Sequence, residues 1–358
     1  MRVALVGPPQ SGKSVLFAAI AESGGSHVDL SRADQPHLAV VKVPDERLDW
    51  LSAYYKPKKH TPAELAFLDL PGMDLHDEAG RERAKAHWAA MRQSDMLAFV
   101  VRAFDSQTVA AYRDRVDALA DVEELLAEMI FADLDQVTVR VGKLEAALRK
   151  PSPAAQREEQ TRELDLMKRL AAALEKGEPL AGAIHGDAQA KMLRSFGFLS
   201  QKPMLAAMNR SEEEAGAPSP EKLGPLPCLG LSAKIEEEIA RLAPQERTEF
   251  LADLGIASPA RDRLIRACYE RAGLVSFFTV GEDECRAWTV PAGTDAVSAA
   301  GEIHSDLARG FIRAEVVSYA DFRAAGDMKG AKAAGKVRLE GKTYVVRDGD
   351  IIYFRFNV

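Results

Sequence analysis

The residues best suited to chemistry form a glycine-containing loop near the start of the chain. The loop reads GPPQSGKS, satisfies the pattern GxxxxGK[ST], and consists of Gly7, Pro8, Pro9, Gln10, Ser11, Gly12, Lys13 and Ser14. An apolar run at residues 2–6 precedes it and helical spacing begins at Val15, so the loop should join a strand to a helix. There its backbone N–H groups can cradle phosphates, Lys13 can reach the β and γ phosphates, and the Ser14 hydroxyl can ligate Mg²⁺. The sequence therefore predicts a nucleotide-binding P-loop.

An acidic motif follows the apolar run at residues 63–70. Asp69 is followed by Leu-Pro-Gly, so Gly72 completes a DxxG spacing. Asp69 is the expected carboxylate for Mg²⁺, directly or through water, and the Gly72 N–H can contact the γ phosphate. Where many P-loop GTPases carry a water-orienting glutamine, this chain has Met73, which cannot orient water. His76 is the candidate replacement because histidine exchanges a proton near neutral pH; the alternative is an inert surface histidine.

Two later runs predict a site that reads the base. One is Asn209, Arg210, Ser211 and Glu212 and the next is Ser232, Ala233 and Lys234, each at the end of an apolar run. In guanine-specific P-loop proteins an Asn-Lys-x-Asp run places a carboxylate on the N1 and N2 donors of guanine, and a Ser-Ala-Lys run closes the pocket. Arginine and glutamate replace the lysine and aspartate here, so guanine recognition should be weakened. We expect Asn209 to contact the base.

The elements that must position these residues alternate between strand and helix patterns. Apolar runs at residues 2–6, 38–43, 63–70, 96–102, 202–208 and 225–231 predict an open α/β sheet. From about residue 109 to 149 apolar residues recur every three or four positions, and the pattern resumes after Pro153 until Gly177. This predicts an antiparallel helical hairpin, either a packed spacer or a partner-binding arm. The strand-rich and turn-rich end of the chain predicts a separate small domain.

Composition narrows the class of protein. The chain has 358 residues, of which 47% are hydrophobic, a formal net charge of -7, and three widely spaced cysteines. Such a chain should be globular and multidomain, without a disulfide framework or zinc site. Its net charge gives no general attraction to DNA or to an anionic membrane, and its first residues lack the pattern of a signal peptide. We expect a cytoplasmic protein with no membrane or DNA partner.

With these motifs placed, the chain resembles the YchF or Obg-like ATPase family over nearly its whole length. The resemblance extends to VVKVPDERLDWL, FLSQKPMLAAMNRSE, SAKIEEEIARL and GKTYVVRDGDIIYFRFNV. It implies a Ras-like P-loop NTPase domain at residues 1–108 and 200–275, an α-helical hairpin inserted at 109–199, and a β-grasp-like TGS domain at 276–358. It also implies Mg²⁺-dependent ATP hydrolysis and association with ribosomes. The family reads its base with NxxE, a pattern linked to adenine, and Asn209 and Glu212 match it.

The sequence differs from the family pattern at three places, and we expect these differences to affect nucleotide binding less than nucleotide hydrolysis. Gln10 and Val15 replace the usual residues of the phosphate loop, whose lysine and serine are kept. Ala33 stands where the family has a Mg²⁺-ligating threonine, and Ser31 or Asp34 could substitute for it. The charged run DEAGRERAKAHWAAMR replaces a glycine-rich segment after DxxG and predicts a helix. We expect nucleotide binding to survive these changes. They leave two alternatives, binding with hydrolysis and binding without it.

A basic cluster in the last domain offers a surface for RNA. Within 19 residues, opposed only by Glu340, stand Lys329, Lys332, Lys336, Arg338, Lys342 and Arg347. A solvated charged face is the alternative, and the TGS resemblance favours RNA or ribosome contact.

The leading prediction is an Mg²⁺-dependent, ribosome- or RNA-associated ATPase. One alternative is an ATP-binding regulatory or scaffold protein with little hydrolysis, because Ala33 and Met73 remove parts that hydrolysis would use. The other is a GTPase that tolerates Glu212.

Overall fold

The computed structural model describes residues 1–23 and 35–357, so Ser31, Ala33 and Asp34 lie outside the described residues. Contacts divide the chain into two units. The N-terminal unit contains Met1–Ala39 and Ala66–Arg261, and the C-terminal unit contains Val40–Leu65 and Asp262–Val358. The predicted boundary at residue 275 thus lies beyond the break at Arg261, and the helical insertion is not separated from the phosphate-binding part. The three-domain division remains a prediction.

A seven-stranded sheet organises the N-terminal unit, with strand order β2-β4-β1-β5-β6-β8-β7. The pairs β1/β4, β1/β5, β5/β6 and β6/β8 are parallel, as the continuous apolar runs predict. The short β7 pairs antiparallel with β8. The strands are β1 (Arg2–Val6), β2 (His37–Lys42), β4 (Glu64–Asp69), β5 (Met96–Ala103), β6 (Met204–Arg210), β7 (Lys222–Leu223) and β8 (Leu226–Leu231).

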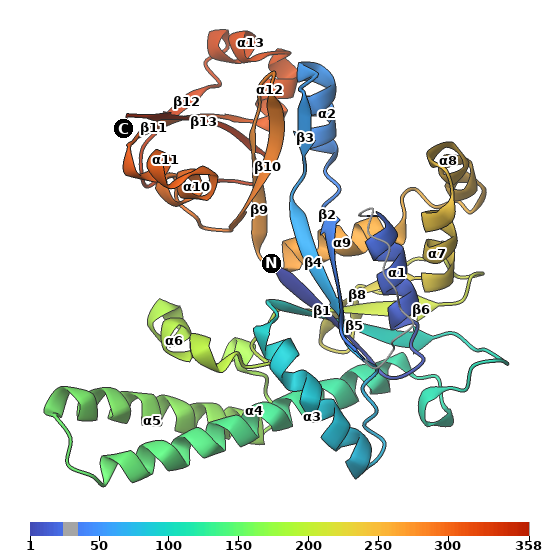
Figure 1. Cartoon of the computed structure of the whole chain (residues 1–358), viewed down its shortest axis with the longest axis vertical. Helices are drawn as coiled ribbons and strands as arrows, with labels where there is room; N and C mark the ends of the chain where they lie inside the picture. Colours follow the sequence, from blue (N-terminus) through green and yellow to red (C-terminus); the bar gives the residue numbers. More distant parts are fainter. Residues whose placement is uncertain (24–34, 358) are drawn as a thin grey trace. The chain divides into compact units, whose positions relative to one another are not determined.

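Helices connect these strands and cover the sheet (Figure 1). One face packs against α3 and α4, where Leu97, Phe99 and Val101 of β5 meet Met91 and Met129. The helix α1 packs against β1 and α7. The predicted charged helix after DxxG is confirmed as α3. The helices outside the hairpin are α1 (Lys13–Ser23), α3 (Glu78–Gln93), α7 (Ala233–Arg241), α8 (Pro244–Asp253) and α9 (Ala260–Arg271), the last of which crosses the boundary between units.

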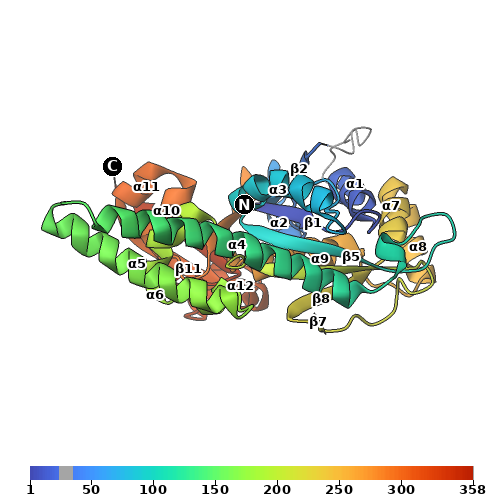
Figure 2. The same ribbon diagram turned by 90° about the horizontal axis from the view of Figure 1, so that it is seen from below.

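The predicted helical hairpin is formed by α4 (Ala118–Leu148) and α5 (Ala154–Glu175), which lie side by side in both views (Figures 1 and 2). Val137 and Leu144 of α4 pack against Met167 and Leu170 of α5. The predicted start near residue 109 is wrong, because Asp117 caps the helix by accepting a hydrogen bond from the Ala120 N–H at 3.0 Å. The turns η1 (Tyr112–Asp114), η2 (Leu180–Gly182) and η3 (Arg194–Phe196) and the helix α6 (Gly186–Leu193) flank the hairpin.

A six-stranded sheet organises the C-terminal unit, with strand order β12-β11-β13-β9-β10-β3. Its last strand, β3, comes from the first 61 residues of the chain and pairs in parallel with β10. The preceding helix α2 packs on α12, with the rings of Tyr55 and Phe322 stacked 6.0 Å apart. The elements are α2 (Glu46–Tyr55), β3 (Lys59–Thr61), β9 (Leu274–Thr279), β10 (Glu284–Pro291), α10 (Ala296–Ile303), α11 (Ser305–Arg309), β11 (Phe311–Ser318), α12 (Tyr319–Ala325), α13 (Met328–Ala333), β12 (Arg338–Glu340) and β13 (Asp350–Phe356).

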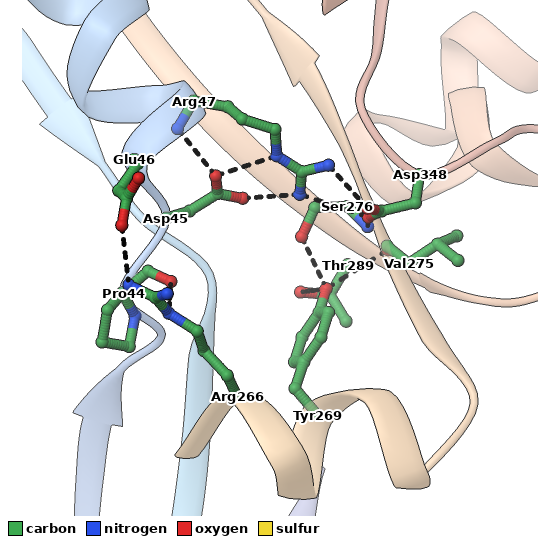
Figure 3. A network of polar contacts seen from close by, with 10 residues as sticks. All are labelled: Pro44, Asp45, Glu46, Arg47, Arg266, Tyr269, Val275, Ser276, Thr289 and Asp348. Carbon is green, nitrogen blue, oxygen red and sulfur yellow. Dashed lines mark hydrogen bonds and ion pairs between the residues drawn. The ribbon is translucent and has the colours of Figure 1, made fainter. Parts of the chain in front are cut away.

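A polar network fixes the start of α2 within this unit (Figure 3). Arg47 donates to the Asp45 carboxylate at 2.9 and 2.8 Å and to Asp348 at 2.5 Å. Asp348 also accepts the Ser276 N–H at 2.9 Å. The hydroxyl of Tyr269 lies 2.8 Å from that of Ser276, so α9, β9 and α2 share one set of contacts. The segment at residues 40–65 is therefore tied to the C-terminal fold by polar bonds as well as by strand pairing.

No helix in residues 1–23 and 35–357 has the length and apolar composition needed to cross a membrane.

Candidate nucleotide site

The P-loop joins β1 to the first turn of α1, as the motif predicts. Gln10 and Gly12 adopt left-handed φ angles of 61° and 84°. A Cβ added to Gly12 would lie 2.1 Å from Nδ2 of Asn209, and one added to Gly7 would lie 2.1 Å from the carbonyl oxygen of Val100. Both positions require glycine because a side chain would collide with fixed neighbours.

Lys13 and Asp69 form a buried ion pair beneath the loop. The Lys13 ammonium donates to one carboxylate oxygen of Asp69 and to the carbonyl oxygen of Leu70. The Ser14 hydroxyl donates to the other Asp69 oxygen at 2.9 Å. Lys13 and Asp69 are only 5% and 3% exposed. The fold thus brings together the three side chains that the sequence assigned to phosphate and metal.

These oxygens suit Mg²⁺, a hard cation that in phosphate sites uses one or two protein groups together with water and phosphate oxygens. Ser14 and Asp69 hold two side-chain oxygens 2.9 Å apart that can act as such ligands. The Ser11 hydroxyl is buried and has no hydrogen-bond partner in the described part of the chain, although most buried polar groups are paired. Such an unused group within the loop fits a site that completes its bonding with a ligand. Within the described residues no three His, Cys, Asp or Glu side chains gather as metal ligands.

Residues 69–77, which begin with the DxxG motif and are called the DxxG segment below, lie against the P-loop. A Cβ added to Gly72 would lie 2.9 Å from Cα of Pro9, and the Met73 N–H donates to the carbonyl oxygen of Gly7 at 2.9 Å. The Met73 side chain is buried in the core at 1% exposure, which agrees with its inability to orient water. His76 is exposed, and its backbone N–H donates to Asp74 at 3.1 Å. A catalytic role for His76 remains a prediction.

A second histidine near the loop, His87 of α3, was not predicted. Burial and the positive charge of Lys13 hold the pKa of the half-buried His87 imidazole below its usual value. Lys13 therefore acts electrostatically on His87, which favours the neutral imidazole. The charge pattern of this segment predicts a helix but does not indicate that His87 lies within electrostatic range of Lys13.

A cavity of about 590 Å³ adjoins the P-loop at the carboxyl ends of β5, β6 and β8. Its lining includes the predicted residues Gln10, Gly12, Val15, Asn209, Arg210, Glu212, Ser232, Ala233 and Lys234. It also includes residues that the sequence reading missed, namely Phe104, Asp105, Ser106, Thr108 and Val109. Their position directly after the apolar run of β5 could have indicated this, because ligands of open α/β sheets bind beyond the carboxyl ends of the strands.

Asn209 connects this cavity to the phosphate loop. Its Nδ2 donates to the carbonyl oxygen of Ser11 at 2.9 Å, and its Oδ1 accepts the Ala233 N–H at 2.9 Å. At the cavity, Glu212 forms an ion pair with Lys234, and both side chains are exposed. The base-contact roles of Asn209 and Glu212 remain predictions.

Arg210 is placed differently from a lysine lying along the base. Its guanidinium donates to the carbonyl oxygens of Ala217 and Pro218 at 3.0 and 3.1 Å. It also covers Gly230, where a Cβ would lie 2.6 Å from the guanidinium carbon. These contacts give the side chain a role in holding the loop after β6.

A P-loop after the first strand of a parallel sheet, a strand-terminal aspartate bound to its lysine and serine, and an adjoining cavity define a P-loop NTPase. Residues 2–132 match the family described as 50S ribosome-binding GTPase, and residues 274–357 match the YchF GTPase C-terminal family, described as a protein of unknown function. The chain is 38% identical to the ribosome-binding ATPase YchF of Bacillus subtilis, with 99% of this chain and 98% of that protein covered. It is 33% identical to Obg-like ATPase 1 of Oryza sativa, with 100% and 92% covered.

Structural similarity agrees with these relatives. The YchF GTPase of Schizosaccharomyces pombe superposes with a TM-score of 0.83 at 25% identity, covering 99% of this chain and 97% of that one. The chain belongs to the YchF/Obg-like ATPase family, which confirms the resemblance and the α/β P-loop fold predicted from the sequence.

Proposed function

We propose that this chain is an Mg²⁺-dependent ATPase that associates with ribosomes in the cytoplasm. The observation that supports its nucleotide site most directly is the placement of Asn209, because its hydrogen bonds to Ser11 and Ala233 join the phosphate loop to the wall of the cavity. Lys13, Ser14 and Asp69 would hold the triphosphate and Mg²⁺, which supplies positive charge to the phosphate oxygens. Full-length relatives are named ribosome-binding ATPases.

Adenine is the proposed base. Glu212 has one methylene more than the aspartate of a guanine site, and its carboxylate is engaged by Lys234. A guanine ring would therefore leave its N1 and N2 donors without a free, correctly placed acceptor. GTP is the weaker candidate.

The nucleotide assignment is tested by titrating the purified chain with ATP and GTP, with and without Mg²⁺, by calorimetry. We expect ATP to bind more tightly than GTP and Mg²⁺ to strengthen binding. Much tighter binding of GTP would overturn the assignment. Phosphate release is then compared with that of Lys13→Ala.

Binding of ATP without phosphate release above the Lys13→Ala background would favour a regulatory or scaffold protein. The buried Met73 favours this second candidate, because it leaves DxxG without a side chain that can orient water.

For the ribosome, we propose the basic cluster of the C-terminal unit as one contact surface. Three of its members are paired with acids, Lys332 with Glu315 at 3.0 Å, Lys336 with Asp321 at 3.2 Å and Arg338 with Glu340 at 3.0 Å. The other three, Lys329, Lys342 and Arg347, are exposed, and no described residue forms an ion pair with them. These three charges are the ones available to phosphates.

Co-sedimentation with ribosomes at two salt concentrations tests the surface. The triple change Lys329→Glu, Lys342→Glu and Arg347→Glu should release the chain from ribosomes. A matched triple change to glutamate on the helical hairpin, at Arg149, Lys150 and Arg157, should not. Equal release by both would show that the loss of binding follows the change in overall charge and is not specific to this surface, and no release by the first would place the contact elsewhere.

A further inference from the structure

Two consecutive side chains hold the backbone of Leu75 on both sides. Leu75 lies three residues after Gly72 in the DxxG segment. Its N–H donates to the hydroxyl of Tyr112 at 2.8 Å, and its carbonyl oxygen accepts from Nη2 of Arg113 at 2.8 Å. The Leu75 side chain is 1% exposed in the core beneath α3 and α4. Side chains from a remote turn therefore take both hydrogen-bonding groups of this residue.

The turn that supplies these side chains has an uncommon backbone. Arg113 and Asp114 adopt φ angles of 54° and 53°, in the left-handed region that non-glycine residues rarely occupy. Two such residues in succession persist only where their surroundings hold them, and conformations of this kind concentrate at functional sites. The hydrogen bonds to Leu75 are part of what holds this turn.

The same turn is anchored to the helical hairpin. Arg113 pairs with Glu124 in the second turn of α4, and Arg115 pairs with Asp121 at 3.1 Å in the first. The helix α3, which follows the DxxG segment, is joined to α4 by Arg81 and Glu128 at 2.9 Å. Motion of the DxxG segment relative to α4 must therefore stretch or break several directed polar bonds.

On its other side the DxxG segment contacts the phosphate loop. The Met73 N–H bonds to the carbonyl oxygen of Gly7, and Gly72 lies against Pro9. An unbroken series of contacts thus runs from Gly7 through Met73 and Leu75 to Arg113.

We propose that Tyr112 and Arg113 are positioning residues. Their hydrogen bonds to Leu75 fix the position of the DxxG segment, and the Arg113–Glu124 pair transmits a change in that position to α4. This rests on the proposed function and on the prediction from the DxxG motif that the Gly72 N–H contacts the γ phosphate of ATP. Met73 contributes no polar side chain to that region, so the position of Gly72 depends on backbone contacts at Met73 and Leu75. If the γ phosphate draws Gly72 toward it, the hydrogen bonds at Leu75 pull on the turn at residues 112–114. The pair between Arg113 and Glu124 then transmits this pull to the start of α4.

Tyr112→Phe is the sharpest variant, because it removes one hydroxyl and keeps the ring. Arg113→Gln removes the charge that reaches Leu75 and Glu124, and Arg113→Lys should restore part of the pairing with Glu124. The matched controls are Tyr319→Phe, which removes a hydroxyl 3.4 Å from Arg323, and Arg162→Gln, which breaks an exposed pair with Glu158 and leaves the contacts of Leu75 and of the start of α4 intact. All variants are made in the full chain, and thermal unfolding shows whether each is folded.

Amide hydrogen exchange is the first measurement. Loss of the Tyr112 hydroxyl leaves the Leu75 N–H without a protein acceptor, and we expect exchange across residues 72–77 to be about fivefold faster or more. Binding of Mg²⁺ with a non-hydrolysable ATP analogue should change exchange across residues 118–128 in the unaltered chain. Tyr112→Phe and Arg113→Gln should lose this second response, and the controls should keep it.

ATP turnover is the second measurement. For Tyr112→Phe we expect kcat to fall about fivefold or more while the Kd for ATP changes less than twofold, because Leu75 lies in the core and outside the base cavity. Unchanged exchange at residues 72–77 in Tyr112→Phe, or unchanged analogue response and kcat in both variants, would overturn the proposal. If the unaltered chain binds ATP without hydrolysing it, the proposed ATPase fails, and the exchange measurements alone decide whether Tyr112 and Arg113 couple the two segments.

Discussion

Asn209 and Ser11, 198 positions apart in sequence, are joined by a 2.9 Å hydrogen bond from the Asn209 amide to the Ser11 carbonyl oxygen. The same amide group accepts the Ala233 N–H, so one buried side chain fixes the phosphate loop relative to the Ser-Ala-Lys turn. A nucleotide bound as proposed would span both parts, and a site that is already formed before the ligand arrives has less ordering to complete on binding.

Asn209→Ala should weaken ATP binding about tenfold or more, because two bonds that align the halves of the site disappear, each of about 1 kcal/mol. Calorimetric titration of the folded variant measures the change. Asn357→Ala, an exposed asparagine near the end of the chain, is the matched control. Equal affinities in Asn209→Ala and the control would show that this amide does not organise the site.

Lys13→Met should destabilise the nucleotide-free protein more than a surface substitution does. The change leaves the buried Asp69 carboxylate with Ser14 alone, and removing one partner of a buried pair costs about 3–5 kcal/mol. Urea unfolding without nucleotide tests this. The double change Lys13→Met and Asp69→Asn should recover part of the loss, since no uncompensated charge remains. A double variant no more stable than the single one would contradict the pairing.

Much of the site could be predicted because it is local in sequence. Residues 7–14 form a local motif whose loop geometry follows from its own sequence. Apolar runs lead to Asp69, Asn209 and Ala233, and the carboxyl ends of such runs meet at one edge of a parallel sheet. Motif and periodicity therefore predict that side chains from four segments gather at one edge of the sheet.

The remaining features depend on partners that no pattern reveals. The guanidinium of Arg210 points to the Ala217 and Pro218 carbonyls because a loop returns beside it, which its place in the motif does not indicate. The strand β3 was missed because three residues with Lys, His and Thr carry no apolar signal and pair only with β10. The turn at Tyr112 was assigned to a helix because apolar spacing continued through it, whereas the Asp117 cap decides where α4 begins.

Asp121 should make stability depend on pH. Burial raises the pKa of this carboxyl to about 6, helped by Glu124 and Asp117, while Arg115 acts in the opposite direction. A carboxyl whose pKa is raised in the folded state does not lower the free energy of unfolding below the pKa of about 4 that it has in the unfolded chain. Above that pH the free energy of unfolding falls, and the loss is complete once the pH has risen through the folded-state pKa of about 6. The full cost, about 1–3 kcal/mol, is present above pH 7.

Urea unfolding at pH 5 and pH 7.5 measures this effect. Asp121→Asn should reduce the loss of stability between the two values, because the amide does not ionise. The exposed Asp253→Asn serves as control and should leave the loss unchanged. An identical pH dependence in the unaltered chain and in Asp121→Asn would show that this carboxyl is already ionised freely.

Arg47→Ala should loosen the start of α2 within the C-terminal unit. The substitution leaves the carboxylates of Asp45 and Asp348 facing each other without the guanidinium between them (Figure 3), and it removes the cation 5.3 Å from the centre of the Phe278 ring. Because the Arg47 and Asp348 side chains are 29% and 50% exposed, solvent screening limits the expected loss to about 1 kcal/mol. Hydrogen exchange should accelerate in residues 46–55. Arg309→Ala breaks a comparable but more exposed pair with Asp306 and should leave those residues unchanged, so equal acceleration in both variants would contradict a specific role for Arg47.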